Sequence, residues 1–94
     1  MTLQDIADRI QAGLSGSQFD GSLKFDCGDD GAIVLAENQA STKDQDADCT
    51  IRLSQDNLVK LLTGKLNPMT GVVMGKLKVS GDMSVAMKLG KLLG

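Results

Sequence analysis

The segment from residue 64 to residue 89 constrains the fold more than any other part of this 94-residue chain. It holds four of the five methionines and the only proline, and glycines interrupt it at positions 64, 71, 75 and 81. Because glycine tends to end helices and proline to begin them, the segment divides into short helices and a strand. Methionine is unbranched and adapts to different shapes. The segment predicts a pliable apolar region that opens into a cavity, although gap filling in a core with two aromatic residues explains the methionines equally well.

The composition indicates one globular domain covering residues 1–94, because 41% of the residues are apolar and the charge density is ordinary. No apolar run approaches the roughly 20 residues that a bilayer-spanning helix needs. The first ten residues lack the basic start and apolar stretch of a secretory signal. Cys27 and Cys49 have no metal-binding spacing, and we expect them to stay reduced, which favours a cytoplasmic location.

Charge is distributed unevenly along the chain. Residues 1–56 hold eleven acids and four bases, whereas residues 57–94 hold six lysines and one acid, Asp82. There is no arginine cluster with interleaved aromatics, so we expect no nucleic-acid partner. The lysine-bearing apolar half is compatible with transient contact with an anionic membrane surface, but a solvated face with ordinary lysines is the simpler interpretation.

Helical periodicity marks the N-terminus. Leu3, Ile6, Ile10 and Leu14 recur at helical spacing after a capping threonine, Thr2, so we expect an amphipathic helix over residues 3–14. Ser15-Gly16-Ser17 should follow its end. The polar face of this helix is acidic and not lysine-rich, which favours docking on the core over membrane binding.

Alternation with a period of two marks the strands. It predicts strands over residues 23–27, 32–36, 49–53 and 77–79, with one short edge strand near residues 39–42. A hairpin should join the first two, through residues 28–31. Each clear strand has one apolar face, which we expect helices to cover while the opposite face meets water.

Three further helices follow from capping residues. Ser54 begins a helix that ends at Gly64, and Asn67-Pro68 begins a short helix that ends at Gly75. We expect Met69, Val72 and Val73 of the short helix to face inward. Asp82 caps the final helix, which is apolar nearly all round and should therefore be buried on more than one side. This order of elements predicts an α+β fold with a mostly antiparallel sheet.

The polar inventory disfavours an enzyme. The chain has no histidine, the commonest general base, and a buried thiol is usually inert, which disfavours a catalytic role for Cys49. The alternating acids Asp44, Asp46 and Asp48 suggest a calcium-binding loop. However, the glycine and glutamate of an EF-hand loop are missing at the required positions. We therefore predict no metal ion and no cofactor.

Several ordered motifs resemble the sterol carrier protein 2 family. They are Ala-Asp-Cys-Thr-Ile at 47–51, Leu-Thr-Gly-Lys-Leu-Asn-Pro at 62–68, Gly-Lys-Leu-Lys-Val at 75–79 and Gly-Asp-Met-Ser-Val-Ala-Met-Lys-Leu at 81–89. The match covers nearly half of the chain. The resemblance implies a five-stranded, mainly antiparallel sheet covered by helices, with an apolar tunnel for fatty acids, acyl-CoAs, sterols or phospholipids. In that family, the segments that match residues 68–74 and 82–93 help to form the wall of the tunnel or to close it.

The expected lipid-binding residues come from two sources. The resemblance places six of them at the cavity: Met69, Val72, Val73, Met83, Met87 and Leu89. Strand or helix phase alone adds the others: Phe25, Ile33, Leu35, Ile51, Leu53, Leu58, Leu62, Leu77 and Val79. The leading hypothesis is a non-enzymatic lipid carrier, and the alternative is an accessory domain that presents a lipid or acyl intermediate to a partner enzyme.

Overall fold

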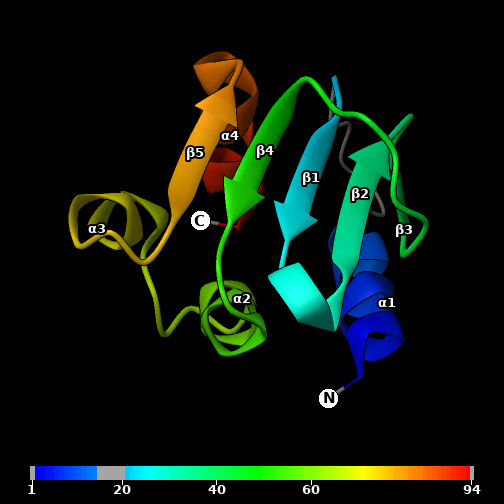
Figure 1. The fold of residues 1–94 in the computed structure, drawn as a ribbon, viewed down its shortest axis with the longest axis horizontal. Helices are drawn as coiled ribbons and strands as arrows, with labels where there is room; N and C mark the ends of the chain where they lie inside the picture. Colours follow the sequence, from blue (N-terminus) through cyan, green and yellow to red (C-terminus); the bar gives the residue numbers. More distant parts are fainter. Residues whose placement is uncertain (1, 15–20, 94) are drawn as a thin grey trace.

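The computed structural model describes residues 2–14 and 21–93, with side chains described up to residue 88. Figure 1 shows the elements in chain order: α1 (Leu3–Leu14), β1 (Leu23–Asp26), the short 3₁₀ helix η1 (Gly28–Asp30), β2 (Ala32–Ala36), β3 (Gln39–Ser41), β4 (Cys49–Arg52), α2 (Gln55–Leu62), α3 (Pro68–Val73), β5 (Lys78–Gly81) and α4 (Met83–Leu93). The predicted α+β class and the predicted elements are confirmed. The expected Ser15-Gly16-Ser17 boundary lies outside the described residues.

The five strands form one sheet in the order β3-β2-β1-β4-β5. Neighbouring strands pair antiparallel except the central strand β1 and its neighbour β4, which are parallel. The register places Phe25 of β1 between Ile33 of β2 and Ile51 of β4, and Ile51 pairs in turn with Val79 of β5. Apolar side chains therefore form continuous rows on one face of the sheet.

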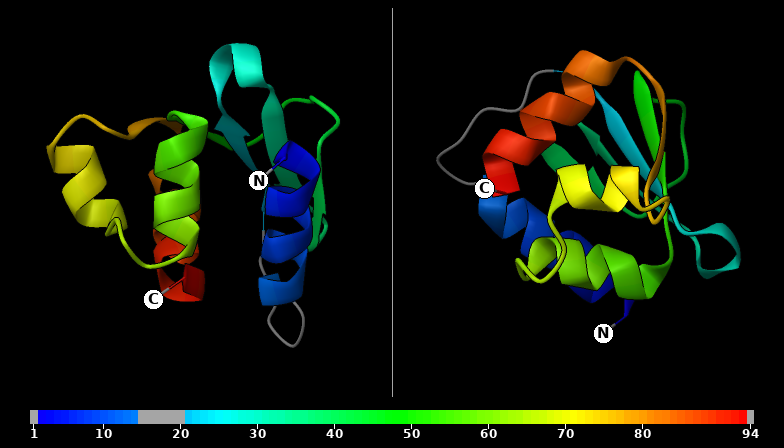
Figure 2. Two further views of the ribbon diagram at one scale, coloured as in Figure 1. Left: turned by 90° about the horizontal axis from the view of Figure 1, so that it is seen from below. Right: turned by 90° about the vertical axis from the view of Figure 1, so that its left-hand side faces the viewer.

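Helices cover that apolar face. Figure 2 shows α1, α2 and α4 on one side of the sheet, while α3 lies apart beyond β5. Phe25, Ile33 and Leu58 of α2 are fully buried in the resulting core. Burial of large apolar side chains contributes about 1.5–3 kcal/mol each, so this layer holds the fold together.

The opposite face of the sheet meets water only in part. Arg52 is exposed there, but Val34 of β2 is completely buried on the same face. Lys24, its register partner, forms an ion pair of 2.7 Å with Asp44 in the connection between β3 and β4. The expectation of a fully solvated outer face is therefore wrong at Val34, close to where this connection approaches the sheet.

Side-chain hydrogen bonds hold α1 at two places, its first turn and its contact with β3. At its start, the Asp5 amide donates to Thr2 Oγ1 at 3.1 Å and the Thr2 amide donates to Asp5 Oδ2 at 3.0 Å, which is a reciprocal cap. Farther along, Gln11 accepts a hydrogen bond of 2.7 Å from the Ala40 amide of β3. Because Ile6, Ile10 and Leu14 are buried, α1 is docked on the core as predicted.

Candidate functional site

Two helices beside β5 carry large apolar side chains that solvent reaches. Among the described residues, every exposed large hydrophobic comes from α3, its C-cap or α4: Met69, Val72, Val73, Met74, Met83 and Met87. We call these six the α3–α4 apolar surface. Isolated exposed apolar residues are normal, but six on the two helices that precede and follow one edge strand make these helices the candidate binding surface.

Gly71 determines which side of α3 faces the core. It is the buried residue of this six-residue helix, and a Cβ at this position would lie 2.8 Å from Leu77 Cγ. The helix backbone thus approaches Leu77 more closely than any side chain would permit. At about 100° per residue, Met69 and Val73 lie about 200° around the helix from Gly71, and they are 74% and 82% exposed.

The predicted inward orientation of Met69, Val72 and Val73 is therefore wrong in this structure. Hydrophobic periodicity assumes that the most apolar stripe of a helix faces the core. In α3, the side of the helix that packs on the core is the one at Gly71, because only glycine lets the backbone come this close to Leu77. In addition, α3 makes few contacts with the other helices and strands.

The first turns of α4 show a similar exposure. The Ser84 amide donates to Asp82 Oδ1 at 2.9 Å, which confirms Asp82 as the helix cap. Val85 is buried against the core, whereas Met83 and Met87, one turn apart, are 53% and 68% exposed. The expectation that α4 is buried on more than one side is wrong over residues 83–88, because nothing in the described chain covers its methionine stripe.

The remaining predicted site residues with described side chains are buried in the hydrophobic core or packed against it. The hydrophobic core contains Phe25, Ile33, Leu35, Ile51, Leu53, Leu58 and Leu77, with Leu62 and Val79 packed against it. The side chain of Leu89 lies outside the described residues. Met74 belongs to the same group of methionines but is not among the predicted site residues, and it is 61% exposed. The available signal was its place among the four methionines of residues 64–89.

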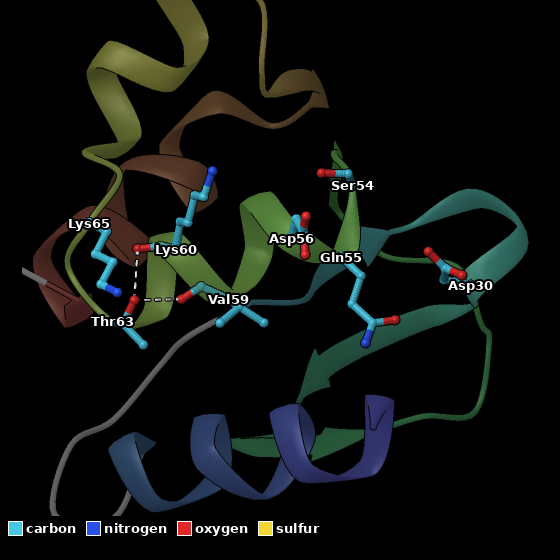
Figure 3. Close-up of a pocket in the computed structure, with 8 residues that line it drawn as sticks. All are labelled: Asp30, Ser54, Gln55, Asp56, Val59, Lys60, Thr63 and Lys65. Atoms are coloured by element: carbon cyan, nitrogen blue, oxygen red, sulfur yellow. Dashed lines mark hydrogen bonds between the residues drawn. The ribbon is translucent and has the colours of Figure 1, made fainter. Parts of the chain in front are cut away.

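A separate hollow of about 780 Å³ lies beside α2 (Figure 3). Its lining is mostly polar or charged: Asp30, Ser54, Gln55, Asp56, Val59, Lys60, Thr63 and Lys65. Thr63 Oγ1 donates to the Val59 carbonyl at 2.9 Å, so its hydroxyl satisfies a backbone carbonyl in the last turn of α2. None of the predicted lipid-binding residues lines this hollow, and acids and lysines balance within it. Its chemistry does not match an apolar ligand.

The two cysteines are poorly suited to nucleophilic chemistry. Both are buried free thiols. Burial, reinforced by Asp30 and Asp26, raises the pKa of Cys27 to about 11. Burial likewise raises the pKa of the Cys49 thiol, with Asp82 adding to the effect. Because the thiolate is the reactive form, neither residue is activated near neutral pH.

The acidic connection between β3 and β4 has structural roles. Asp44 pairs with Lys24, and Asp48 Oδ2 accepts a hydrogen bond of 3.2 Å from the Ser22 amide. Within residues 2–14 and 21–88, no group of histidines, cysteines and acids is arranged to hold a metal ion. In the described part of the chain, no helix is long and apolar enough to cross a membrane.

Comparisons with known proteins agree with this architecture. Sterol carrier protein 2 of Gallus gallus is 51% identical over 53 residues, which are 56% of this chain and 10% of the chicken protein. Peroxisomal multifunctional enzyme A of Dictyostelium discoideum is 43% identical over 63 residues, which are 67% of this chain and 13% of that protein. The chain thus spans about a tenth of the length of these curated relatives.

A solved structure extends the likeness to the whole chain. Sterol carrier protein 2 from Aedes aegypti, determined in complex with palmitate, superposes with a TM-score of 0.80 at 19% identity, covering 100% of this chain and 97% of that one. At this identity the likeness shows the fold. A family model described as the SCP-2 sterol transfer family matches residues 2–94. This chain belongs to the SCP-2 sterol transfer family.

Proposed function

We propose that this chain is a non-enzymatic lipid carrier that works as one domain and holds one acyl chain against the α3–α4 apolar surface. The observation that carries the proposal is the exposure of six large apolar side chains on α3, its C-cap and α4, together with the few contacts that α3 makes with the other helices and strands. Water is a poor partner for such a surface, and an acyl tail is a good one. The palmitate named in the complex of the Aedes aegypti relative supports a fatty acid as the ligand.

In this proposal, loading brings the exposed and buried residues together. Met83 and Met87 contact the tail first, and α3 closes over it with Met69, Val72 and Val73. The core residues beneath, with Leu89, complete the lining. A sixteen-carbon tail would gain roughly 8–12 kcal/mol gross at about 0.8 kcal/mol per methylene, before the costs of ordering. Fatty acids are the first ligand class to test, ahead of acyl-CoAs, phospholipids and sterols.

The free, buried state of Cys27 and Cys49 supports a reducing compartment, and we place the carrier in the cytoplasm on that basis. Non-enzymatic action rests on the raised pKa of both thiols together with the absence of histidine from the sequence.

Replacing Met83 and Met87 with serine tests the proposal. The fold should persist because both side chains are exposed. If each methionine covers about 40 Å² of ligand, its loss costs about 1 kcal/mol, so the affinity of the double variant for a fluorescent fatty acid should fall about thirtyfold. The control truncates two exposed side chains of similar length elsewhere, Gln39→Ser and Gln45→Ser. Equal affinity of both variants would overturn the proposed site.

A second candidate function is an accessory domain that presents an acyl intermediate to an enzyme. The Dictyostelium discoideum relative favours it, because that protein is named as a multifunctional enzyme and this chain matches 13% of its length. The two functions differ in vesicle assays. A carrier moves fatty acid between donor and acceptor vesicles by itself, whereas an accessory domain binds the ligand but transfers it poorly until its enzyme is added.

A further inference from the structure

The two edge strands of the sheet, β3 and β5, are covered differently. At β3, the side-chain amide of Gln11 lies along the outer edge. Its Oε1 accepts a hydrogen bond of 2.7 Å from the Ala40 amide, and its Nε2 donates to the Asn38 carbonyl at 3.4 Å. A side chain of α1 thus occupies the place of a neighbouring strand. Because an open edge strand can pair with another chain, this contact closes β3 to such pairing.

The second half of β5 has no such cover. The Asp82 amide donates to the Asp48 carbonyl at 2.8 Å, which continues the antiparallel ladder between β4 and β5. Hydrogen-bonded and non-hydrogen-bonded pairs alternate along such a ladder, so the amides and carbonyls of Val79 and Gly81 point away from β4. Within the described residues, these four backbone groups have no hydrogen-bond partner.

The start of β5 is already occupied on its outer side. The Leu77 amide donates to the Gly71 carbonyl of α3 at 3.1 Å. Figure 1 shows α3 beside the start of β5, and no other described element lies beyond the second half of this strand. The open part of the edge is therefore limited to Val79 and Gly81.

One symmetric pairing with a second copy satisfies both open residues. If two β5 strands pair antiparallel with Ser80 opposite Ser80, each Val79 faces Gly81 of the other copy, and four backbone hydrogen bonds form. A pairing centred on Val79 would instead bring Gly81 opposite Leu77, whose amide already donates to α3. A pairing centred on Gly81 would bring Val79 opposite Met83, which belongs to α4.

The same register matches opposite charges. With Ser80 at the centre, Lys78 of each copy lies opposite Asp82 of the other, and both residues are exposed. In the described chain Lys78 has no ion-pair partner, and its register partner on β4 is another cation, Arg52. Opposite charges that face each other across two strands stabilise the pair, whereas like charges destabilise it. The register that satisfies the backbone thus also gives Lys78 an acidic partner.

We propose that two copies of this chain pair through β5, so that their five-stranded sheets join into one continuous sheet. The contact involves few residues and lies well below the roughly 800 Å² that each partner buries in a standard interface, so the dimer is weak. Its hydrogen bonds need none of the six side chains of the α3–α4 apolar surface. The inference therefore goes beyond the carrier function and does not depend on it.

Hydrogen exchange of the wild-type protein tests the pairing directly. Sedimentation equilibrium should show dimers as the concentration rises from micromolar to millimolar, and the amides of Val79 and Gly81 should exchange more slowly over the same range. The Ser80 amide, which faces β4, should change little. A protein that stays monomeric would overturn the proposal. A dimer in which the Val79 and Gly81 amides exchange as fast as in the monomer would also overturn it, because its interface would lie elsewhere.

Charge reversal tests the register. Lys78→Glu puts two acids opposite each other at both ends of the interface and should weaken dimerisation about tenfold or more. Asp82→Lys should weaken it as well, because two lysines then face each other. Mixed in equal amounts, these two proteins should associate with each other, since both facing pairs are then of opposite charge. The control Lys43→Glu makes the same charge change before β4 and should alter dimerisation by less than about threefold.

Equal weakening by Lys78→Glu and Lys43→Glu would overturn the proposal, because association would then follow net charge alone. A mixture of folded Lys78→Glu and Asp82→Lys proteins that does not associate would overturn the register. Because Asp82 also caps α4, the wild-type exchange measurement decides the proposal if Asp82→Lys does not fold. Binding of a fluorescent fatty acid to the wild-type protein is measured separately. A monomer that binds it overturns the dimer alone, whereas a dimer that does not bind it contradicts the carrier function alone.

Discussion

At the residue scale, two glycines within helices have opposite roles. A Cβ at Gly13 of α1 would meet nothing within 4 Å, whereas a Cβ at Gly71 of α3 would lie 2.8 Å from the buried Leu77. Both backbones are helical, so the intrinsic gain from alanine is similar, about 0.5–1 kcal/mol. The surroundings therefore decide the sign of each substitution.

We expect Gly13→Ala to stabilise the protein by about 0.5–1 kcal/mol. Gly71→Ala should instead destabilise it by about 1–2 kcal/mol, because α3 must move off Leu77 to admit the methyl group. Urea unfolding of the two variants against the wild type measures both changes. A stabilised Gly71→Ala protein would show that α3 is not held by the close approach described above.

Cys27 gives the stability a dependence on alkaline pH. Its thiol, ordinarily with a pKa of 9.0, is raised to about 11 in the folded state, first by burial and then by Asp30 and Asp26. The folded state thus holds this proton more tightly than the unfolded state, so its contribution is complete below about pH 9 and is lost as the pH rises toward 11. Cys27→Ala should flatten the fall of unfolding free energy over this window. An unchanged slope would mean that the thiol is solvated in the folded protein.

Residue identity allowed most of the core to be predicted, but not the exposed site. Period-two alternation correctly placed Phe25 and Ile51 on the buried face of the sheet. The same logic was wrong for Met69 and Val73, because no pattern of side chains reveals that a glycine is the docked residue. That outcome depends on how closely two backbones approach, which is a tertiary property.

At the element scale, α2 and α3 have the same kind of cap but different attachment. Ser54 Oγ accepts from the Asn57 amide at 3.1 Å, and Asn67 Oδ1 accepts from the Met69 amide at 2.9 Å. Beneath its cap, α2 buries Leu58 and Leu61, whereas α3 buries only a glycine among its described residues. Losing the two caps should therefore have different consequences.

We expect Ser54→Ala to lower global stability by about 1 kcal/mol, since α2 is part of the core. Asn67→Ala should leave global unfolding nearly unchanged, because α3 can open by itself. Hydrogen exchange should then show faster exchange at the Gly71 amide, which bonds to the Asn67 carbonyl at 2.8 Å, and little change in the sheet. A global loss from Asn67→Ala as large as that from Ser54→Ala would mean that α3 unfolds only with the core.

Capping residues and periodicity predicted the helices and four of the strands, because those signals are local. The turn between β2 and β3 was harder. Glu37 and Asn38 both have positive φ, 53° and 61°, which matches the backbone of a tight hairpin turn. Glutamate is not a usual residue for such a turn, so the sequence located β3 only as a short strand near residues 39–42. The parallel pairing of β1 with β4 likewise depends on contacts distant in sequence.

At the scale of the whole molecule, the acidic and lysine-rich halves of the chain have separate tasks. The acidic half, residues 1–56, supplies α1 and four of the strands, with most of its large apolar side chains buried. The C-terminal half supplies α3 and α4, which leave theirs exposed beside lysines. If the proposed carrier function holds, the ligand would be covered mainly by α3 and α4, and this surface could change its cover without unfolding the core.

The central claim is that an acyl lipid covers the α3–α4 apolar surface. Native mass spectrometry of the freshly purified protein, alone and then with fatty acids of increasing chain length, tests it most directly. We expect one lipid per chain and an affinity that rises with chain length, by about 0.8 kcal/mol per methylene at most, until the tail exceeds the site. A protein that is empty as purified and binds neither fatty acids nor acyl-CoAs of any length would contradict it.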